Sequence, residues 1–111
     1  MDCLFCKIAS REIPSKAVFE SDQIYAFEDI APKAPTHVLV IPRKHIARLS
    51  DAAAEDAALV GEVAIAAASI ARERGLAHYR LIANNGEGAG QSVFHLHFHL
   101  MGGRPFSWPP G

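Results

Sequence analysis

Three histidines alternate with apolar residues near the end of this 111-residue chain. His95, His97 and His99 are each separated by one residue. In a β-strand, side chains two positions apart point to the same face, and successive imidazoles would lie roughly 6.5 Å apart. The pattern therefore predicts a strand over residues 93–101 with the three imidazoles on one face. The apolar residues of the segment would share the other face and pack under a helix: Phe94, Leu96, Phe98 and Leu100.

Three imidazoles on one face suit two kinds of chemistry. Three histidines can hold a catalytic zinc ion. An imidazole is also a nucleophile, and its ordinary pKa of about 6.5 leaves it mostly neutral at pH 7. A solvated face that happens to carry histidines is a third interpretation, and three in register disfavour it. The spacing alone does not separate the zinc and nucleophile interpretations.

A glycine-rich loop, Asn84 to Ser92, precedes the histidines. It lacks the Gly-Lys-Ser/Thr of a Walker loop, and it leads into a strand rather than the helix of a dinucleotide-binding fold. A flexible hairpin loop is the simplest interpretation. Its alternating glycines nevertheless allow backbone N–H groups to turn toward an anion. The polar side chains at its two ends favour a site for an oxyanion or a phosphate.

A pair of cysteines, Cys3 and Cys6, stands near the start of the sequence. Zinc accepts two thiolates at this spacing, but one pair is only half of a tetrahedral site and needs two further ligands. Two buried thiols without a metal are the alternative, because free cysteine is often simply buried.

The rest of the chain supplies the elements that must position these groups. Residues 17–20 and 24–28 flank Ser-Asp-Gln and predict a β-hairpin. Residues 36–41 are apolar and β-branched and end at a proline, which predicts a buried strand. Residues 79–83 predict another strand before the glycine-rich loop. Strands, one long helix and then strands indicate an α+β fold with an antiparallel sheet.

The long helix is predicted over residues 51–74, which contain ten alanines and one glycine. Ser50 is a suitable N-cap, and Gly75 stands where a C-cap glycine belongs. Two apolar stripes run side by side along this segment, so more than one of its sides should be buried. Because one sheet face covers only one side, a homodimer is the simplest source of a second surface.

Composition narrows the class of protein further. The length fits a single domain over residues 1–111, with 102–111 as a C-terminal tail. A formal net charge of −1 shows no basic excess, which argues against a nucleic-acid partner. Glu55, Asp56 and Glu62 interrupt the alanine-rich segment, so a membrane span is not expected. Two cysteines and no visible targeting segment predict a cytoplasmic protein.

The segment Gln91-Ser-Val-Phe-His-Leu-His-Phe-His-Leu100 resembles the signature of the histidine-triad (HIT) family. Further segments are similar to its HINT branch, the nucleoside phosphoramidases: Glu12-Ile-Pro, Phe27-Glu-Asp-Ile, Ala34-Pro-Thr-His-Val-Leu-Val-Ile-Pro-Arg-Lys-His45 and Trp108-Pro-Pro-Gly111. The resemblance implies an antiparallel sheet of about five strands, one long helix and a short N-terminal helix, with dimerisation through helix and strand.

The resemblance also implies an activity, the hydrolysis of purine nucleoside 5′-phosphoramidates. His97 would attack the phosphorus and form a nucleotidyl-imidazole, from which water releases the nucleoside monophosphate. His99 would neutralise phosphoryl oxygens or assist the leaving group, and Ser92 would hydrogen-bond the leaving amine. Backbone N–H groups near Gln91 to Val93, after Gly90, would hold the charge of the transferring group. His37 and Asn84 would orient the site.

For the nucleoside, the resemblance implies that Asp29 accepts hydrogen bonds from the ribose hydroxyls. Five apolar residues would form a slot for the purine: Leu4, Phe5, Ile8, Phe27 and Ile30. Core packing is an equally good interpretation of each apolar residue, and a turn is an equally good interpretation of Asp29. Trp108 would reach across the dimer to the partner's substrate pocket.

Relatives in the superfamily carry a structural zinc, and the resemblance assigns its four ligands here to Cys3, Cys6, His45 and His95. No catalytic cofactor is expected. A dinucleoside polyphosphate hydrolase is the neighbouring alternative, and the Trp-Pro-Pro-Gly tail disfavours it. A nucleotidyl transferase is disfavoured because His99 is retained. A non-catalytic nucleotide-binding module and a zinc-dependent hydrolase also remain open.

Overall fold

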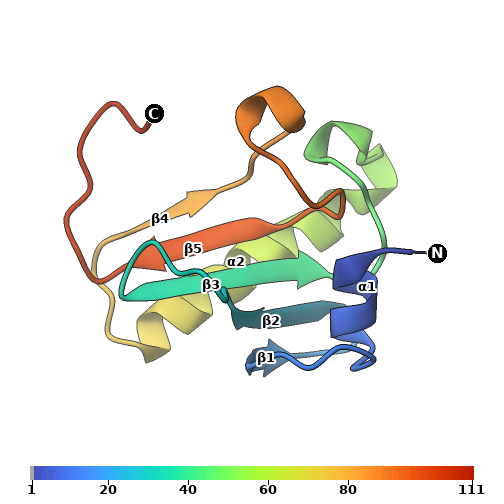
Figure 1. The fold of residues 1–111 in the computed structure, drawn as a ribbon, viewed down its shortest axis with the longest axis horizontal. Coiled ribbons are helices and arrows are strands. Elements are labelled where there is room, and N and C mark those ends of the chain that lie inside the picture. Colours follow the sequence, from blue (N-terminus) through green and yellow to red (C-terminus); the bar gives the residue numbers. More distant parts are fainter. Residues whose placement is uncertain (1) are drawn as a thin grey trace.

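A five-stranded antiparallel sheet forms the centre of the computed structural model, which describes residues 2–111 (Figure 1). The strand order is β1-β2-β3-β5-β4, with a helix packed on each face. The predicted α+β architecture, with one long and one short N-terminal helix, is therefore confirmed. The elements in chain order are α1 (Leu4–Ala9), β1 (Ala17–Glu20), β2 (Ile24–Glu28), β3 (Thr36–Pro42), α2 (Ala57–Glu73), β4 (Tyr79–Ile82) and β5 (Phe98–Gly102).

Strand β3 lies in the middle of the sheet and is buried at every residue. Its side chains alternate between two hydrophobic cores, as the pleat of a strand requires. Val38 and Val40 pack with helix α2, whereas Leu39 and Ile41 pack with helix α1. His37 precedes Leu39 by two residues and so shares the α1 face.

Helix α2 begins at Ala57, six residues later than the alanine-rich composition predicts. Ser50 is therefore not its N-cap. The Asp56 carboxylate accepts hydrogen bonds from the Ala53 N–H (2.9 Å) and from Lys44 Nζ (2.6 Å). These contacts hold residues 49–56 in two short 3₁₀ turns with extended backbone between them. Tertiary contacts thus override the helix propensity of alanine here.

The other end of α2 follows the prediction. Gly75 adopts a left-handed φ of +70° just beyond the helix. The Gly75 N–H donates to the Arg72 carbonyl and the Leu76 N–H donates to the Ala71 carbonyl. This pair of bonds is the Schellman motif, which satisfies carbonyls at a helix end.

Strand β5 begins at Phe98 rather than near residue 93, so the predicted strand is wrong in its first half. On one side β3 pairs only as far as Val40 with Phe98, and on the other β4 pairs only as far as Ile82 with His99. The preceding residues therefore lack strand partners, and the Leu96 N–H donates to the Ile46 carbonyl instead. Phe94 is 42% exposed and does not pack under the helix.

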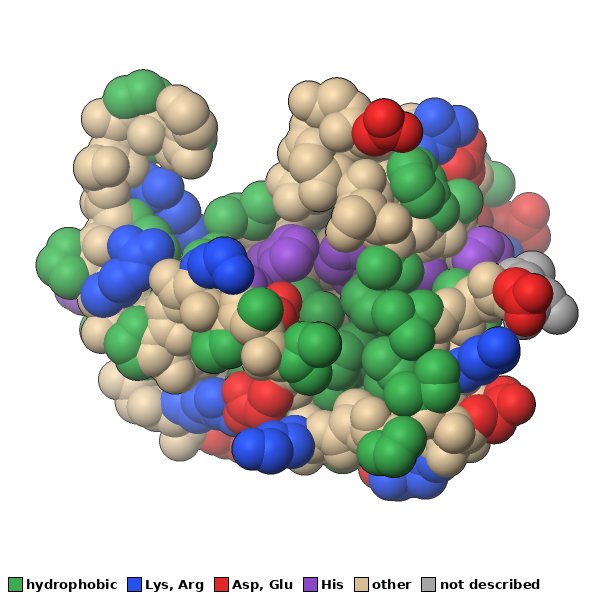
Figure 2. All heavy atoms as spheres, in the orientation of Figure 1, with side chains coloured by type: hydrophobic (Ala, Val, Ile, Leu, Met, Phe, Trp, Pro, Cys, Tyr) green, Lys and Arg blue, Asp and Glu red, His purple; other side chains and the backbone are tan. Residues whose placement is uncertain are grey.

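Beyond β5 the chain runs out as a tail that stands away from the body of the molecule (Figures 1 and 2). Trp108, near the end of this tail, is 83% exposed. Within residues 2–111, no helix combines the length and the apolar character that crossing a bilayer requires.

Candidate active site and metal cluster

His97 is held so that only one of its ring nitrogens is free. Its Nδ1 lies 2.7 Å from the His95 carbonyl oxygen, which can only accept a hydrogen bond. In the neutral ring, Nδ1 therefore carries the proton and Nε2 keeps its lone pair. The ring is buried and packs edge-on against Phe5, with centroids 5.0 Å apart. Burial lowers the pKa of His97, so the neutral, nucleophilic form predominates at pH 7.

His37 and His99 form a second pair whose proton positions also follow from their partners. The Lys33 backbone N–H donates to His37 Nδ1 at 3.0 Å, so the neutral His37 ring carries its proton on Nε2. That Nε2 lies 2.9 Å from His99 Nδ1, which must accept. The proton of His99 is then on its Nε2.

Burial lowers the pKa of both imidazoles of this pair. It lowers the pKa of His99 to about 4, with further contributions from His97 and His37. Burial also lowers the pKa of His37, although the Asp29 carboxylate works in the opposite direction. That carboxylate lies 3.4 Å from His37 Nε2. At neutral pH the two rings are therefore uncharged hydrogen-bonding groups beside one carboxylate.

A cavity of about 700 Å³ opens beside His37. Two of the residues predicted to bind the substrate, Asp29 and Ile30, line this cavity. The Ile30 side chain is 99% exposed, so it does not enclose a pocket for the base. Phe5, Ile8 and Phe27 belong to the packed core on the α1 face. Leu4 is 46% exposed. Most of the predicted apolar slot is therefore packed core, and only Leu4 and Ile30 are exposed beside it. Figure 2 shows the histidines in a band beside hydrophobic side chains.

Sequence reasoning missed six residues that line this cavity, two of which, Pro32 and Pro35, lie in the loop after Asp29. The other four come from the segment after α1 and the end of β2: Pro14, Ser15, Lys16 and Glu28. Segments that resemble the family contain such residues: Glu12-Ile-Pro includes Pro14, and Phe27-Glu-Asp-Ile includes Glu28.

The glycine-rich loop is fastened by hydrogen bonds of the Gln91 side chain. The Gln91 side chain is buried; its Oε1 accepts from the Gly86 N–H at 2.8 Å. Its Nε2 donates to the carbonyls of Ala47 (2.8 Å) and Val93 (3.0 Å). Gly90 takes a left-handed φ of +95°. One amide thus ties the two ends of the loop together and to the segment before α2.

Two further predicted residues lie around this loop. Asn84 is half-buried next to Gly90. Ser92 is exposed and lines a second cavity of about 530 Å³. That cavity is shared with Asp2, Cys3, Leu4, His45, Val93 and Phe94. The structure therefore places Ser92 and Val93 beside the cysteine pair, and not among the residues that line the Asp29 cavity.

The four predicted metal ligands converge, and their ligand atoms all lie within 4.8 Å of one another. His95 Nδ1 is 3.3 Å from Cys3 Sγ, 3.5 Å from Cys6 Sγ and 3.3 Å from His45 Nδ1. A tetrahedral zinc with ordinary bond lengths separates two nitrogens by about 3.4 Å and a nitrogen from a sulfur by about 3.6 Å. The four residues therefore lie close enough to bind one metal ion.

Two other features of this cluster fit a metal. His95 Nε2 donates to the Pro42 carbonyl at 2.7 Å, which directs the lone pair of Nδ1 at the cysteines, as second-shell partners of ligating histidines do. Burial and the neighbouring Cys3 raise the pKa of the Cys6 thiol to about 11. A metal that binds here would displace this proton and take the thiolate.

The three histidines of the triad thus face three different partners. His95 turns to the cysteines, His97 to a backbone carbonyl and His99 to His37. They do not converge on one point, as the ligands of a three-histidine zinc site must. The geometry therefore favours the nucleophile interpretation over the zinc-triad interpretation.

Comparison with known proteins agrees with this arrangement, and the chain belongs to the HIT domain family, whose model matches residues 10–106. An uncharacterised HIT-like protein of Synechocystis is 51% identical, over 99% of this chain and 97% of its own length. The crystal structure of a HIT family hydrolase from Legionella pneumophila superposes with a TM-score of 0.96 at 51% identity, covering 99% of this chain and all of that one. A histidine triad nucleotide-binding protein from Candida albicans gives 0.83 at 33% identity, covering 97% and 83%.

Proposed function

We propose that the protein is a HINT-type phosphoramidase that hydrolyses the P–N bond of purine nucleoside 5′-phosphoramidates to the nucleoside monophosphate. The observation that carries this proposal is the fixed tautomer of His97, whose Nδ1 is bonded to the His95 carbonyl. A buried neutral imidazole with a free Nε2 is suited to attack an electrophilic phosphorus.

The proposed reaction has two steps. His97 Nε2 forms a bond to phosphorus while the P–N bond breaks, and the amine takes up a proton from solvent as it leaves. A water molecule next attacks the phosphorus of the nucleotidyl-histidine, loses a proton and releases the nucleoside monophosphate with free His97. His99 carries its ring proton on Nε2, so it can donate a hydrogen bond to a phosphoryl oxygen or to the departing amine.

Surrounding residues take the roles expected from the family. Asp29 accepts hydrogen bonds from the ribose hydroxyls in the cavity beside His37, and Phe5 and Phe27 support the base. Ser92 binds the leaving amine. Backbone N–H groups at Gln91 to Val93 stabilise the charge of the transferring group, and the buried Gln91 amide that fixes this loop supports that role.

The names of two similar proteins support the general part of the proposal, which is nucleotide binding and hydrolysis. The Legionella protein is named a hydrolase and the Candida protein a nucleotide-binding protein. We extend both properties to this chain and place it in the cytoplasm. We further propose that zinc occupies the cysteine–histidine cluster in a structural role.

Substrate preference tests the proposed reaction directly. We expect adenosine 5′-phosphoramidate to be hydrolysed with a kcat/KM on the order of 100-fold above that of a diadenosine polyphosphate, measured by ³¹P NMR. The guanosine analogue should be cleaved comparably if the site accepts purines. The reverse preference would identify a dinucleoside polyphosphate hydrolase. Tight nucleotide binding without turnover would identify a binding module.

We also propose a homodimer, supported by the apolar character of α2 and by exposed apolar side chains such as Ile65, which is 70% exposed on that helix. Light scattering after size-exclusion chromatography should give twice the 12.0 kDa chain mass at micromolar concentration. In such a dimer the extended tail would bring Trp108 to the partner's substrate pocket. A monomer mass would contradict both expectations.

A further inference from the structure

The turn that follows β5 is fastened to the loop that carries Asp29. Gly103 takes a φ of +91°, and a Cβ added there would meet the Pro35 Cβ at 2.8 Å. The next residue, Arg104, donates from Nε and Nη2 to the Lys33 carbonyl oxygen at 3.2 and 3.1 Å. Two successive residues of the turn therefore contact the loop at two neighbouring points.

Lys33 is also the residue that fixes the tautomer of His37. Its N–H donates to His37 Nδ1, and His37 Nε2 in turn donates to His99 Nδ1. The base of the loop is closed separately, because the Asp29 N–H donates to the His37 carbonyl at 2.9 Å. The far side of the loop, which holds Lys33, accepts two hydrogen bonds from Arg104, besides the bond from Lys33 Nζ to the Ala31 carbonyl within the loop.

We propose that the Gly103–Arg104 turn is a clamp on this loop and that Arg104 is a positioning residue for the His37–His99 pair. Its guanidinium holds Lys33 in place, Lys33 selects the His37 tautomer, and His37 directs the proton of His99 toward the substrate side. The planar fork of an arginine suits this task because two of its N–H groups reach one carbonyl oxygen together. The consequence for turnover rests on the proposed function; the position of His37 does not.

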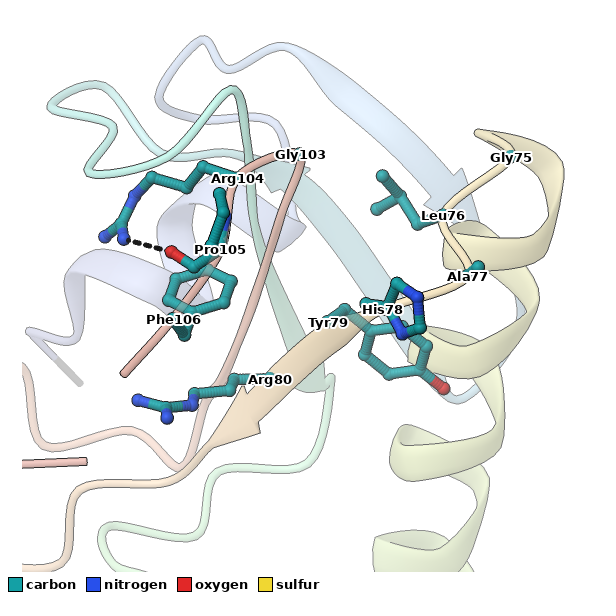
Figure 3. A pocket seen from close by; sticks show the side chains of 10 residues that line it. All are labelled: Gly75, Leu76, Ala77, His78, Tyr79, Arg80, Gly103, Arg104, Pro105 and Phe106. Carbon is teal, nitrogen blue, oxygen red and sulfur yellow. Dashed lines mark hydrogen bonds between the residues drawn. The ribbon is translucent and has the colours of Figure 1, made fainter. Parts of the chain in front are cut away.

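A second arginine in the same region provides a matched control. Arg104 and Arg80 both lie against the ring of Phe106, with their guanidinium carbons 4.4 and 5.2 Å from its centroid (Figure 3). Arg80 comes from β4 and donates to the Ser107 carbonyl. It therefore contacts the same part of the tail as Arg104, but no hydrogen bond joins it to Lys33 among the residues described.

The test is the tautomer of His37, read from long-range ¹H–¹⁵N NMR of the full-length protein at pH 7. In the wild type we expect the Nε2–H form. In Arg104→Ala the His37 nitrogens should move toward values averaged between the two tautomers. The kcat should fall roughly 3- to 10-fold, because hydrogen bonds that position the pair are lost. The KM should change less than about twofold, because the hydrogen bonds of Arg104 within residues 2–111 go to the Lys33 and Pro105 carbonyls and not to a residue assigned to the substrate.

Arg80→Ala should leave the His37 signals at their wild-type positions. An unchanged His37 tautomer in Arg104→Ala, or an equal change in both variants, overturns the proposal. If Arg104→Ala fails to fold, Arg104→Lys is measured instead, because a lysine retains charge but cannot present the fork, and an unaltered His37 there also overturns it. A wild type without phosphoramidase activity refutes the proposed function alone, since the NMR result still decides the clamp.

Discussion

Replacing His97 with glycine should lower the turnover of adenosine 5′-phosphoramidate by at least about 1,000-fold, while nucleotide affinity stays within a few-fold of wild type. The reason is that different residues bind the nucleotide and react with it. We assign nucleotide binding to Asp29 and the glycine-rich loop, and we assign the bond to phosphorus to His97 Nε2. Steady-state kinetics and calorimetric titration with the nucleoside monophosphate measure the two quantities separately.

Two further variants make this result specific. His97→Asn places an amide N–H near the His95 carbonyl, so it retains a donor for the bond that His97 Nδ1 makes at 2.7 Å without supplying a nucleophile. It should be as inactive as the glycine variant but closer to wild type in thermal stability. His78→Gly serves as the control, because His78 is exposed and is not assigned to the site. This variant should retain full activity. Wild-type turnover in either His97 variant would disprove the nucleophile assignment.

Removing the zinc that we propose for the cysteine–histidine cluster should lower the thermal unfolding midpoint by on the order of 10–20 °C, because a metal held by four protein ligands contributes several kcal/mol to folding. The cluster joins α1, through Cys3 and Cys6, to the segments that carry His45 and His95. Without the metal, α1 should loosen and expose Phe5, which supports His97. Calorimetric scans before and after dialysis against a strong chelator measure the change.

Cys6→Ser should reproduce the effect of the chelator, and chelation should not destabilise that variant further. Elemental analysis of the purified wild type should find about one zinc per chain, as a single four-ligand site requires. At 25 °C the metal-free protein should keep most of its turnover. If activity disappears with the fold intact by circular dichroism and returns on adding zinc, the metal is catalytic and the mechanism proposed here is wrong.

Much of the fold follows from local patterns in the sequence. The hairpin of β1 and β2 and the buried strand β3 are predicted within one residue of their ends. They are short runs of β-formers bounded by turn residues or proline, so local signals specify them fully. Gly75 likewise marks the end of α2 because only a residue tolerant of positive φ fits there easily.

The differences arise where contacts distant in sequence decide the outcome. Alanine at 52–54 favours a helix, yet the bond from Lys44 to Asp56 sets the start of α2. The alternation at 93–101 predicts one strand, yet a strand needs partners, and β3 and β4 supply none before Phe98. His95 can therefore turn to the cysteines while His97 and His99 remain together. The role of Lys33 could not be predicted, because a backbone N–H has no sequence signature.

The alternation along β3 has a practical consequence for protein engineering. The even-numbered residues Val38 and Val40 pack against α2, and the odd-numbered residues Leu39 and Ile41 lie on the side of the histidines. A combinatorial library confined to the even positions and their α2 neighbours would therefore vary robustness to heat independently of substrate choice. A second library could vary three residues at the cavity rim, Ser15, Lys16 and Glu28. It would vary substrate choice with little effect on robustness to heat, so the two properties can be optimised in parallel and then combined.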